Sequence, residues 1–125
     1  MTTKAPTAPP GLGARGRAFW RATVGAFTLE RDELELLAET ARTMDEIDKL
    51  AAVILRDGVT AVGSTGQPRA HPAVAEVRQH RLALSRLLAA LALPAADGST
   101  IRTPASLQAA HAARTRWRRR DDGAA

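Results

Sequence analysis

A glycine-rich segment in the middle of the chain has the spacing of a nucleotide-binding loop. In the run GVTAVGST, Gly58 and Gly63 are followed by Ser64 and Thr65, an order like that of the Walker A motif, whose backbone N–H groups hold phosphates. The lysine of that motif is missing. The motif also needs a strand before it and a helix directly after it, whereas here a helical pattern precedes the glycines and more loop follows. We therefore do not expect a nucleotide site.

The three histidines are the residues that could bind a metal or act as general bases. His71, His80 and His111 show neither ligand spacing nor nearby carboxylates in a recognisable pattern, and the chain has no cysteine to complete a zinc site. His71 precedes Pro72, whose ring holds it extended, so that it can serve a helix N-terminus. No Ser/His/Asp set, paired-carboxylate motif or cofactor loop is present. We predict no metal, no cofactor and no enzymatic activity.

Arginines at the two ends of the chain are the remaining groups that could do chemistry, which would be the binding of phosphates. The net charge is +5. Residues 1–27 carry four basic residues and no acidic one, whereas residues 28–57 carry nine acidic residues against four basic ones. The candidate DNA contacts are Arg15, Arg17, Arg21, Arg114, Arg116, Trp117, Arg118, Arg119 and Arg120.

Two interpretations of these basic ends stay open. The arginines of residues 114–120 could neutralise several phosphates while Trp117 stacks on a base, or the run could be a solubilising tail. The arginines near the N-terminus could bind DNA, or they could be the charged outer face of a short helix.

Composition favours an all-α fold of one domain. The chain has 125 residues, and aromatic residues make up only 3% of it, so a core must be built from aliphatic side chains and alanine. The absence of cysteine suits a reducing cytoplasm. The longest apolar run, residues 87–96, is interrupted by Pro94 and is too short to span a bilayer. We expect a protein without a secretion signal that does not enter a membrane.

The pattern along the chain predicts three helices. Residues 1–10 lack periodicity and are expected to be a disordered arm. Residues 13–26 form a short helix with a basic side, and residues 28–57 form a long acidic helix that starts at Thr28 and stops at Gly58. Along it Asp48 is the one polar interruption of the apolar pattern. A third helix begins at Pro72 and continues to about residue 92.

The connection between the two long helices is predicted to be a β-turn-like structure. Residues 59–62 and 68–71 would be short extended arms around a Gly-Ser-Thr-Gly turn. Helices joined in this way lie antiparallel, so residues 50–55 should face Val74 and Val77, and residues 34–41 should face residues 84–91.

The helical hairpin formed by residues 28–94 has more apolar surface than one partner helix can cover. Residues 50–55, LAAVIL, are apolar all round, and so is most of LALSRLLAALAL in the third helix. We expect a second copy of the chain to cover the excess, through the residues Leu50, Val53, Ile54, Leu55, Leu84, Leu87, Leu88 and Leu91. Residues 95–125 are expected to be a linker followed by a basic helix or tail.

The order of motifs within residues 11–94 resembles the small subunit of phage terminases. The matching features are the opening GRAFW, the acidic long helix, the turn GSTGQ, the pair His71-Pro72 and the closing LALP. The resemblance implies a non-enzymatic protein of the host cytoplasm that assembles into a ring and binds double-stranded phage DNA near its packaging start. It implies delivery of that DNA to the separate large subunit, which holds the ATPase and nuclease.

By the same resemblance, residues 28–94 would be the oligomerisation hairpin and the first helix would belong to the DNA-binding part. Many small terminase subunits carry a full helix-turn-helix domain, whereas only one short helix precedes the hairpin here. Two alternatives stay open. One is an oligomeric adaptor that binds only the large subunit, and the other is a small dimeric DNA-binding regulator.

Overall fold

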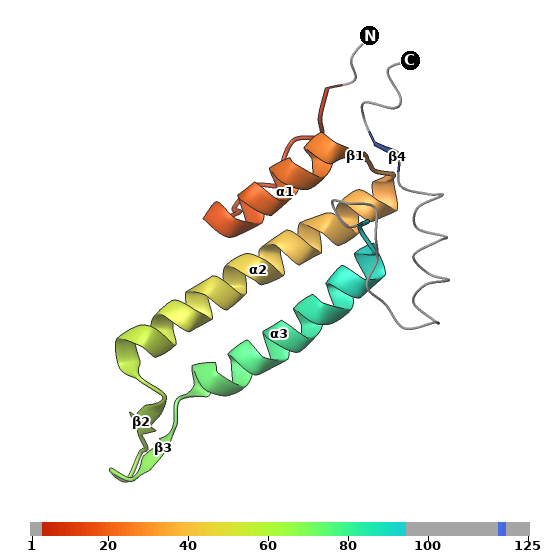
Figure 1. The fold of residues 1–125 in the computed structure, drawn as a ribbon. Helices are drawn as coiled ribbons and strands as arrows, with labels where there is room; N and C mark the ends of the chain where they lie inside the picture. The colour runs from red at the N-terminus through yellow and green to blue at the C-terminus, as the bar shows by residue number, and fades with distance from the viewer. Residues whose placement is uncertain (1–3, 95–117, 120–125) are drawn as a thin grey trace.

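The computed structural model describes residues 4–94 and 118–119, and in this part the protein is mostly helical, which confirms the predicted fold class in that respect. Three helices lie side by side with the longest in the middle (Figure 1). The helices are α1 (Ala14–Ala26), α2 (Arg31–Asp57) and α3 (Pro72–Leu91), and the short strands are β1 (Phe27–Thr28), β2 (Thr60–Val62), β3 (Pro68–Ala70) and β4 (Arg118–Arg119).

The start of α2 differs from the prediction. Thr28 was expected to cap this helix, but Thr28 belongs to β1, and Glu30 is the N-cap residue instead. Glu30 and Glu33 form a capping box in which the backbone N–H of Glu30 donates to Glu33 Oε2 at 2.8 Å. Each glutamate thereby satisfies a backbone N–H at the start of the helix. The predicted end is confirmed, since Gly58 follows the last helical residue with a φ of 81°.

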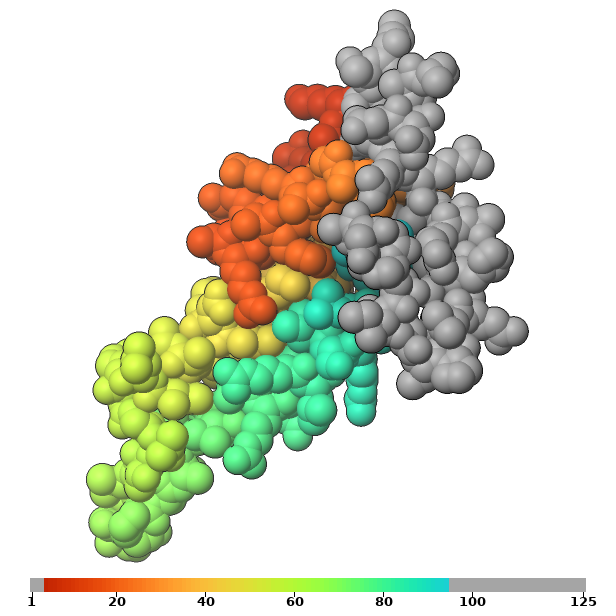
Figure 2. Space-filling view, viewed as in Figure 1, coloured from red at the N-terminus to blue at the C-terminus, as the bar shows by residue number. Residues whose placement is uncertain are grey.

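The connection between α2 and α3 is a two-stranded β-hairpin, as predicted. β2 and β3 are antiparallel, with Thr60 opposite Ala70 and Val62 opposite Pro68. The turn is closed by the N–H of Gly63, which donates to the carbonyl of Gln67 at 2.7 Å. This hairpin extends beyond the helices at one end of the molecule (Figure 2).

His71 serves the N-terminus of α3, which confirms the role expected from the His-Pro pair. Its backbone is extended, and Nδ1 accepts a hydrogen bond from the N–H of Ala73 at 3.1 Å. Its Nε2 lies 3.1 Å from Asp57 Oδ2. His71 therefore joins the end of α2 to the start of α3.

The core consists of two clusters along α2. In one, Leu37 and Ala41 of α2 pack with Leu91 of α3 and with the buried residues of α1. In the other, Val77 packs beside Leu50 and Ile54. These pairings follow the predicted facing segments. Leu84 differs, because it packs with Met44 and Ile47 rather than with residues 34–41.

The residues before α1 contact the helix, although they form neither helix nor strand at positions 4–9. Trp20 Nε1 donates to the carbonyl of Pro6 at 3.2 Å, and Ala8 packs against the first core cluster. The expectation of a disordered arm therefore does not describe this segment. Trp20 orders it because a buried indole N–H needs an acceptor.

Candidate nucleic-acid interface

A buried carboxylate of α2 fixes the start of α1. Asp45 is only 8% exposed, and its Oδ2 and Oδ1 accept hydrogen bonds from the N–H groups of Gly13 at 2.6 Å and Gly16 at 2.7 Å. These are the N-cap and the third residue of α1, whose N–H groups have no partner within the helix. The negative charge also suits the positive end of the helix dipole. Asp45 thus caps a helix that lies about thirty positions away in sequence.

The same contact explains a glycine in α1. A Cβ at Gly16 would lie 2.6 Å from the carbonyl oxygen of Ala41 and would overlap the carboxylate of Asp45. The two helices therefore approach so closely that only glycine fits. Sequence analysis missed Asp45 and named Asp48 as the polar interruption, but Asp48 is exposed.

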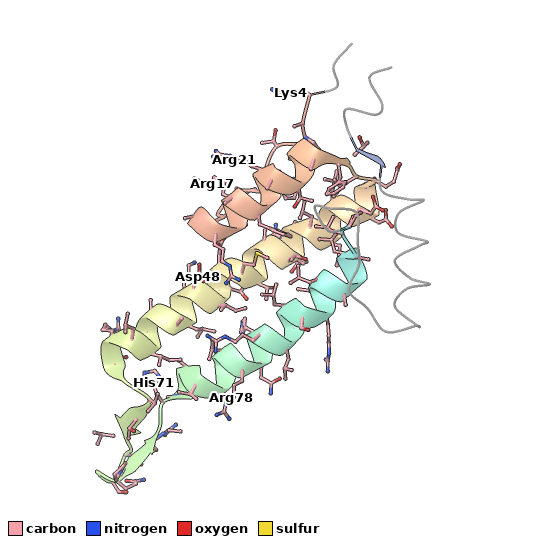
Figure 3. All side chains as sticks on the ribbon, viewed as in Figure 1. Lys4, Arg17, Arg21, Asp48, His71 and Arg78 are labelled. Atoms are coloured by element: carbon pink, nitrogen blue, oxygen red, sulfur yellow. The ribbon has the colours of Figure 1, made fainter. Side chains whose placement is uncertain are left out.

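The three arginines predicted in the first helix have different environments. Arg15 forms an ion pair with Asp48 at 3.1 Å, and Arg17 donates from Nη2 to the carbonyl of Leu12 at 2.9 Å. Arg21 is exposed, and nothing in residues 4–94 forms a hydrogen bond or ion pair with it. Arg17 and Arg21 lie on the side of α1 that faces away from α2, and Lys4 lies on the N-terminal segment beyond the end of this helix (Figure 3). Among residues 4–94, Arg17 and Arg21 are therefore exposed beside the segment of residues 5–8, while Arg15 is paired with Asp48.

A shallow groove separates residues 5–8 from α1. Its volume is about 380 Å³. Arg17 and Arg21 are two of the residues that line it. Trp20 of α1 and Pro6 of the preceding segment also line it, and they are joined by a hydrogen bond. The lining consists of Ala5, Pro6, Thr7, Ala8, Arg17, Trp20, Arg21, Val24 and Gly25.

The two basic ends of the sequence meet in space. β4 pairs antiparallel with β1, so that Arg119 lies opposite Phe27 and Arg118 opposite Thr28. β1 directly follows α1 (Figure 1). The backbone of residues 118–119 is therefore held at the end of α1, the helix that carries the N-terminal arginines. The other predicted C-terminal contacts, Arg114, Arg116, Trp117 and Arg120, lie outside the described residues.

The residues predicted to mediate oligomerisation fall into three groups. Leu84 and Leu91 are buried in the core of a single chain. Leu50, Val53, Ile54 and Leu87 are partly buried. Leu55 is 89% exposed, and Leu88 is also exposed. The prediction missed the other exposed large hydrophobic residues Val59, Val62 and Leu82, because hydrophobicity alone does not tell which side of a helix or strand the neighbouring element covers.

His71 and His80 both form contacts within the helical hairpin of α2 and α3. His80 Nδ1 lies 2.7 Å from the carbonyl of Glu76, and Nε2 lies 3.0 Å from Glu46 Oε2. Within the described ranges, no three residues of the histidine, aspartate and glutamate types gather as metal ligands would. His111 lies outside those ranges. None of the helices in residues 4–94 combines the length and apolar character that crossing a bilayer requires.

Comparisons with protein-family models, with curated proteins and with solved structures give no significant match. The functional assignment therefore depends on the residues and on the geometry described above.

Proposed function

We propose that this protein is a phage terminase small subunit, a non-catalytic DNA-binding protein that assembles into a ring. In this role it binds double-stranded phage DNA at the packaging start and delivers it to the large terminase subunit in the host cytoplasm. The order of motifs in residues 11–94 supports the family, and the helical hairpin of α2 and α3 would be the oligomerisation unit.

The observation that carries the proposal is the pairing of β4 with β1. It holds the backbone of residues 118–119 at the end of α1, whose Arg17 and Arg21 are exposed. Cations from both ends of the chain can then contact one DNA backbone, and phosphate contacts of this kind supply affinity without base recognition. Repetition of a weak basic surface around a ring raises the overall affinity by multivalency.

Exposed apolar side chains support assembly. Leu55, Val59 and Val62 lie near the β-hairpin end, and Leu82 lies on α3. Exposed large apolar side chains become available to a second copy of the chain in this way.

The test is DNA binding as a function of salt. Each phosphate contact contributes a slope of about −0.9 in the plot of log affinity against log salt. We expect Arg17→Ala/Arg21→Ala and Arg116→Ala/Arg118→Ala/Arg119→Ala/Arg120→Ala each to flatten this slope. The control is Lys49→Ala/Arg69→Ala, which removes two exposed cations elsewhere. If both arginine variants keep the wild-type slope, the arginines at the two ends of the chain do not contact DNA phosphates. A wild-type protein that binds no DNA but binds the large subunit would favour the adaptor alternative.

A further inference from the structure

The outer side of α3 combines exposed arginines with an exposed leucine. Arg78, Arg81 and Arg86 are all exposed, and Leu82 among them is 56% exposed. Arg78 points away from α2 (Figure 3). The one acidic residue of α3, Glu76, lies near His80. We call Arg78, Arg81, Leu82 and Arg86 the arginine face.

The exposed side of α2 carries a complementary row of carboxylates. Asp32, Glu35, Glu39 and Glu46 are spaced by three, four and seven positions, which places them on one side of a helix. All four are exposed. Within residues 4–94, two of these four carboxylates form ion pairs: Glu39 with Arg42, and Glu46 with His80. We call these four residues the acidic stripe.

One molecule cannot bring these two surfaces together. No ion pair links the acidic stripe to the arginine face within residues 4–94. His80 of α3 lies beside the stripe residue Glu46, and Glu76 lies one turn before His80. This side of α3 differs from the side that carries Arg78 and Arg81. A second copy of the chain can place its acidic stripe against the arginine face of the first.

Leu82 distinguishes a protein partner from a nucleic acid. Burial of an apolar side chain is favourable, and a phosphate backbone offers little apolar surface to cover a leucine between arginines. A helix of another copy covers the leucine and pairs with the arginines at the same time. Opposite charges across such a contact also select the partner and its register.

We propose that the acidic stripe of one copy docks on the arginine face of the next. This inference rests on the ring assembly of the proposed function and identifies its interface. Because the two surfaces differ, the contact is heterologous: each copy offers its acidic stripe to one neighbour and its arginine face to the other. Repeated heterologous contacts close into a ring when the rotation between neighbours allows it.

Charge reversal on each surface, followed by mixing, tests the proposal. The first variant is Arg78→Glu/Arg81→Glu/Arg86→Glu, and the second is Glu35→Arg/Glu39→Arg/Glu46→Arg. Each variant alone presents like charges at the contact, so we expect self-association at least tenfold weaker than that of the wild type. In an equimolar mixture each contact between the two different variants regains opposite charges, so assembly should return. The measurement is molar mass by light scattering after size-exclusion chromatography.

Circular dichroism spectra and thermal unfolding establish whether each variant keeps its helices. Leu82→Ser, which changes a single exposed side chain, also tests the contact without reversing a charge, and it should weaken assembly.

Several outcomes separate this inference from the proposed function. A wild-type oligomer whose mass is unaffected by either reversal overturns the interface and leaves the ring intact. Folded variants that dissociate but do not recombine overturn the heterologous pairing. A wild-type monomer overturns the ring and the interface together. If the first variant keeps its mass and loses DNA affinity, the arginine face binds nucleic acid, and the inference is wrong.

Discussion

Asp45 and Gly16 form a buried contact that fixes α1 on α2. The carboxylate accepts the Gly16 N–H at 2.7 Å, and the absence of a side chain at Gly16 leaves room for both Asp45 and the Ala41 carbonyl. Because α1 carries the exposed arginines, this contact decides how the candidate DNA-binding side is oriented on the molecule.

Gly16→Ala should destabilise the protein by about 1–3 kcal/mol, because the added methyl group has no space between α1 and α2. The measurement is the free energy of unfolding in urea. Gly25→Ala is the matched control in the same helix, since nothing lies within 4 Å of a Cβ at that position. Alanine is the better helix former, so the control should be neutral or more stable. Equal stability of the two variants would contradict the close approach at Gly16.

Asp45→Asn should lower the free energy of unfolding by about 1–3 kcal/mol. The amide NH₂ group cannot accept the hydrogen bond that one carboxylate oxygen of Asp45 receives from α1. Asp48→Asn removes only the exposed ion pair with Arg15 and should cost about 0–1 kcal/mol. Urea unfolding of both variants provides the comparison. A larger loss in Asp48→Asn would mean that the ion pair, rather than the buried cap, holds α1.

Asp57 should titrate well below the usual range. A hydrogen bond from Arg56, and then one from His71, lowers the pKa of the Asp57 carboxyl from 3.8 to about 2. Because the pKa of Asp57 is lower in the folded state than in the unfolded state, its ionised carboxylate stabilises the folded protein at pH values above about 4. This contribution is lost as the pH falls from about 4 through 2. The carboxyl ¹³C shift measured against pH reports the midpoint.

Arg56→Ala should raise the Asp57 midpoint most, and His71→Ala should raise it less. A midpoint that stays near 2 in both variants would exclude these partners as the cause.

Leu91 and Leu55 should respond in opposite ways to replacement by alanine. Leu91 is fully buried in the core of one chain, so Leu91→Ala should cost about 2–5 kcal/mol in unfolding free energy. Leu55 is 89% exposed, so Leu55→Ala should change the unfolding free energy of a single chain by less than about 0.5 kcal/mol. As an exposed apolar residue outside the acidic stripe and the arginine face, Leu55 would contribute a second contact between copies, and light scattering should then show weaker self-association for Leu55→Ala. Unaltered assembly would leave those two surfaces as the contact.

Features that depend on neighbouring residues could be predicted from the sequence. Gly58 ends α2, Pro72 begins α3, and His71 caps it, because each of these effects acts through the backbone of adjacent residues. The helical pattern likewise predicted the three helices, and the short arms around the Gly-Ser-Thr-Gly turn predicted the β2–β3 connection. The cap at Thr28 was wrong because two acceptors compete at that helix start, and the capping box of Glu30 and Glu33 satisfies two N–H groups rather than one.

The packing of the helices sets which polar residue is buried, which apolar residues stay exposed and where residues 118–119 lie. The cap on α1 comes from Asp45, and β1 meets β4 across most of the chain length. No local pattern encodes such contacts, because they depend on which helix faces come together when the core packs. The same packing buried Leu84 and Leu91, left Leu55 in solvent, and engaged Arg15 while Arg21 remained exposed.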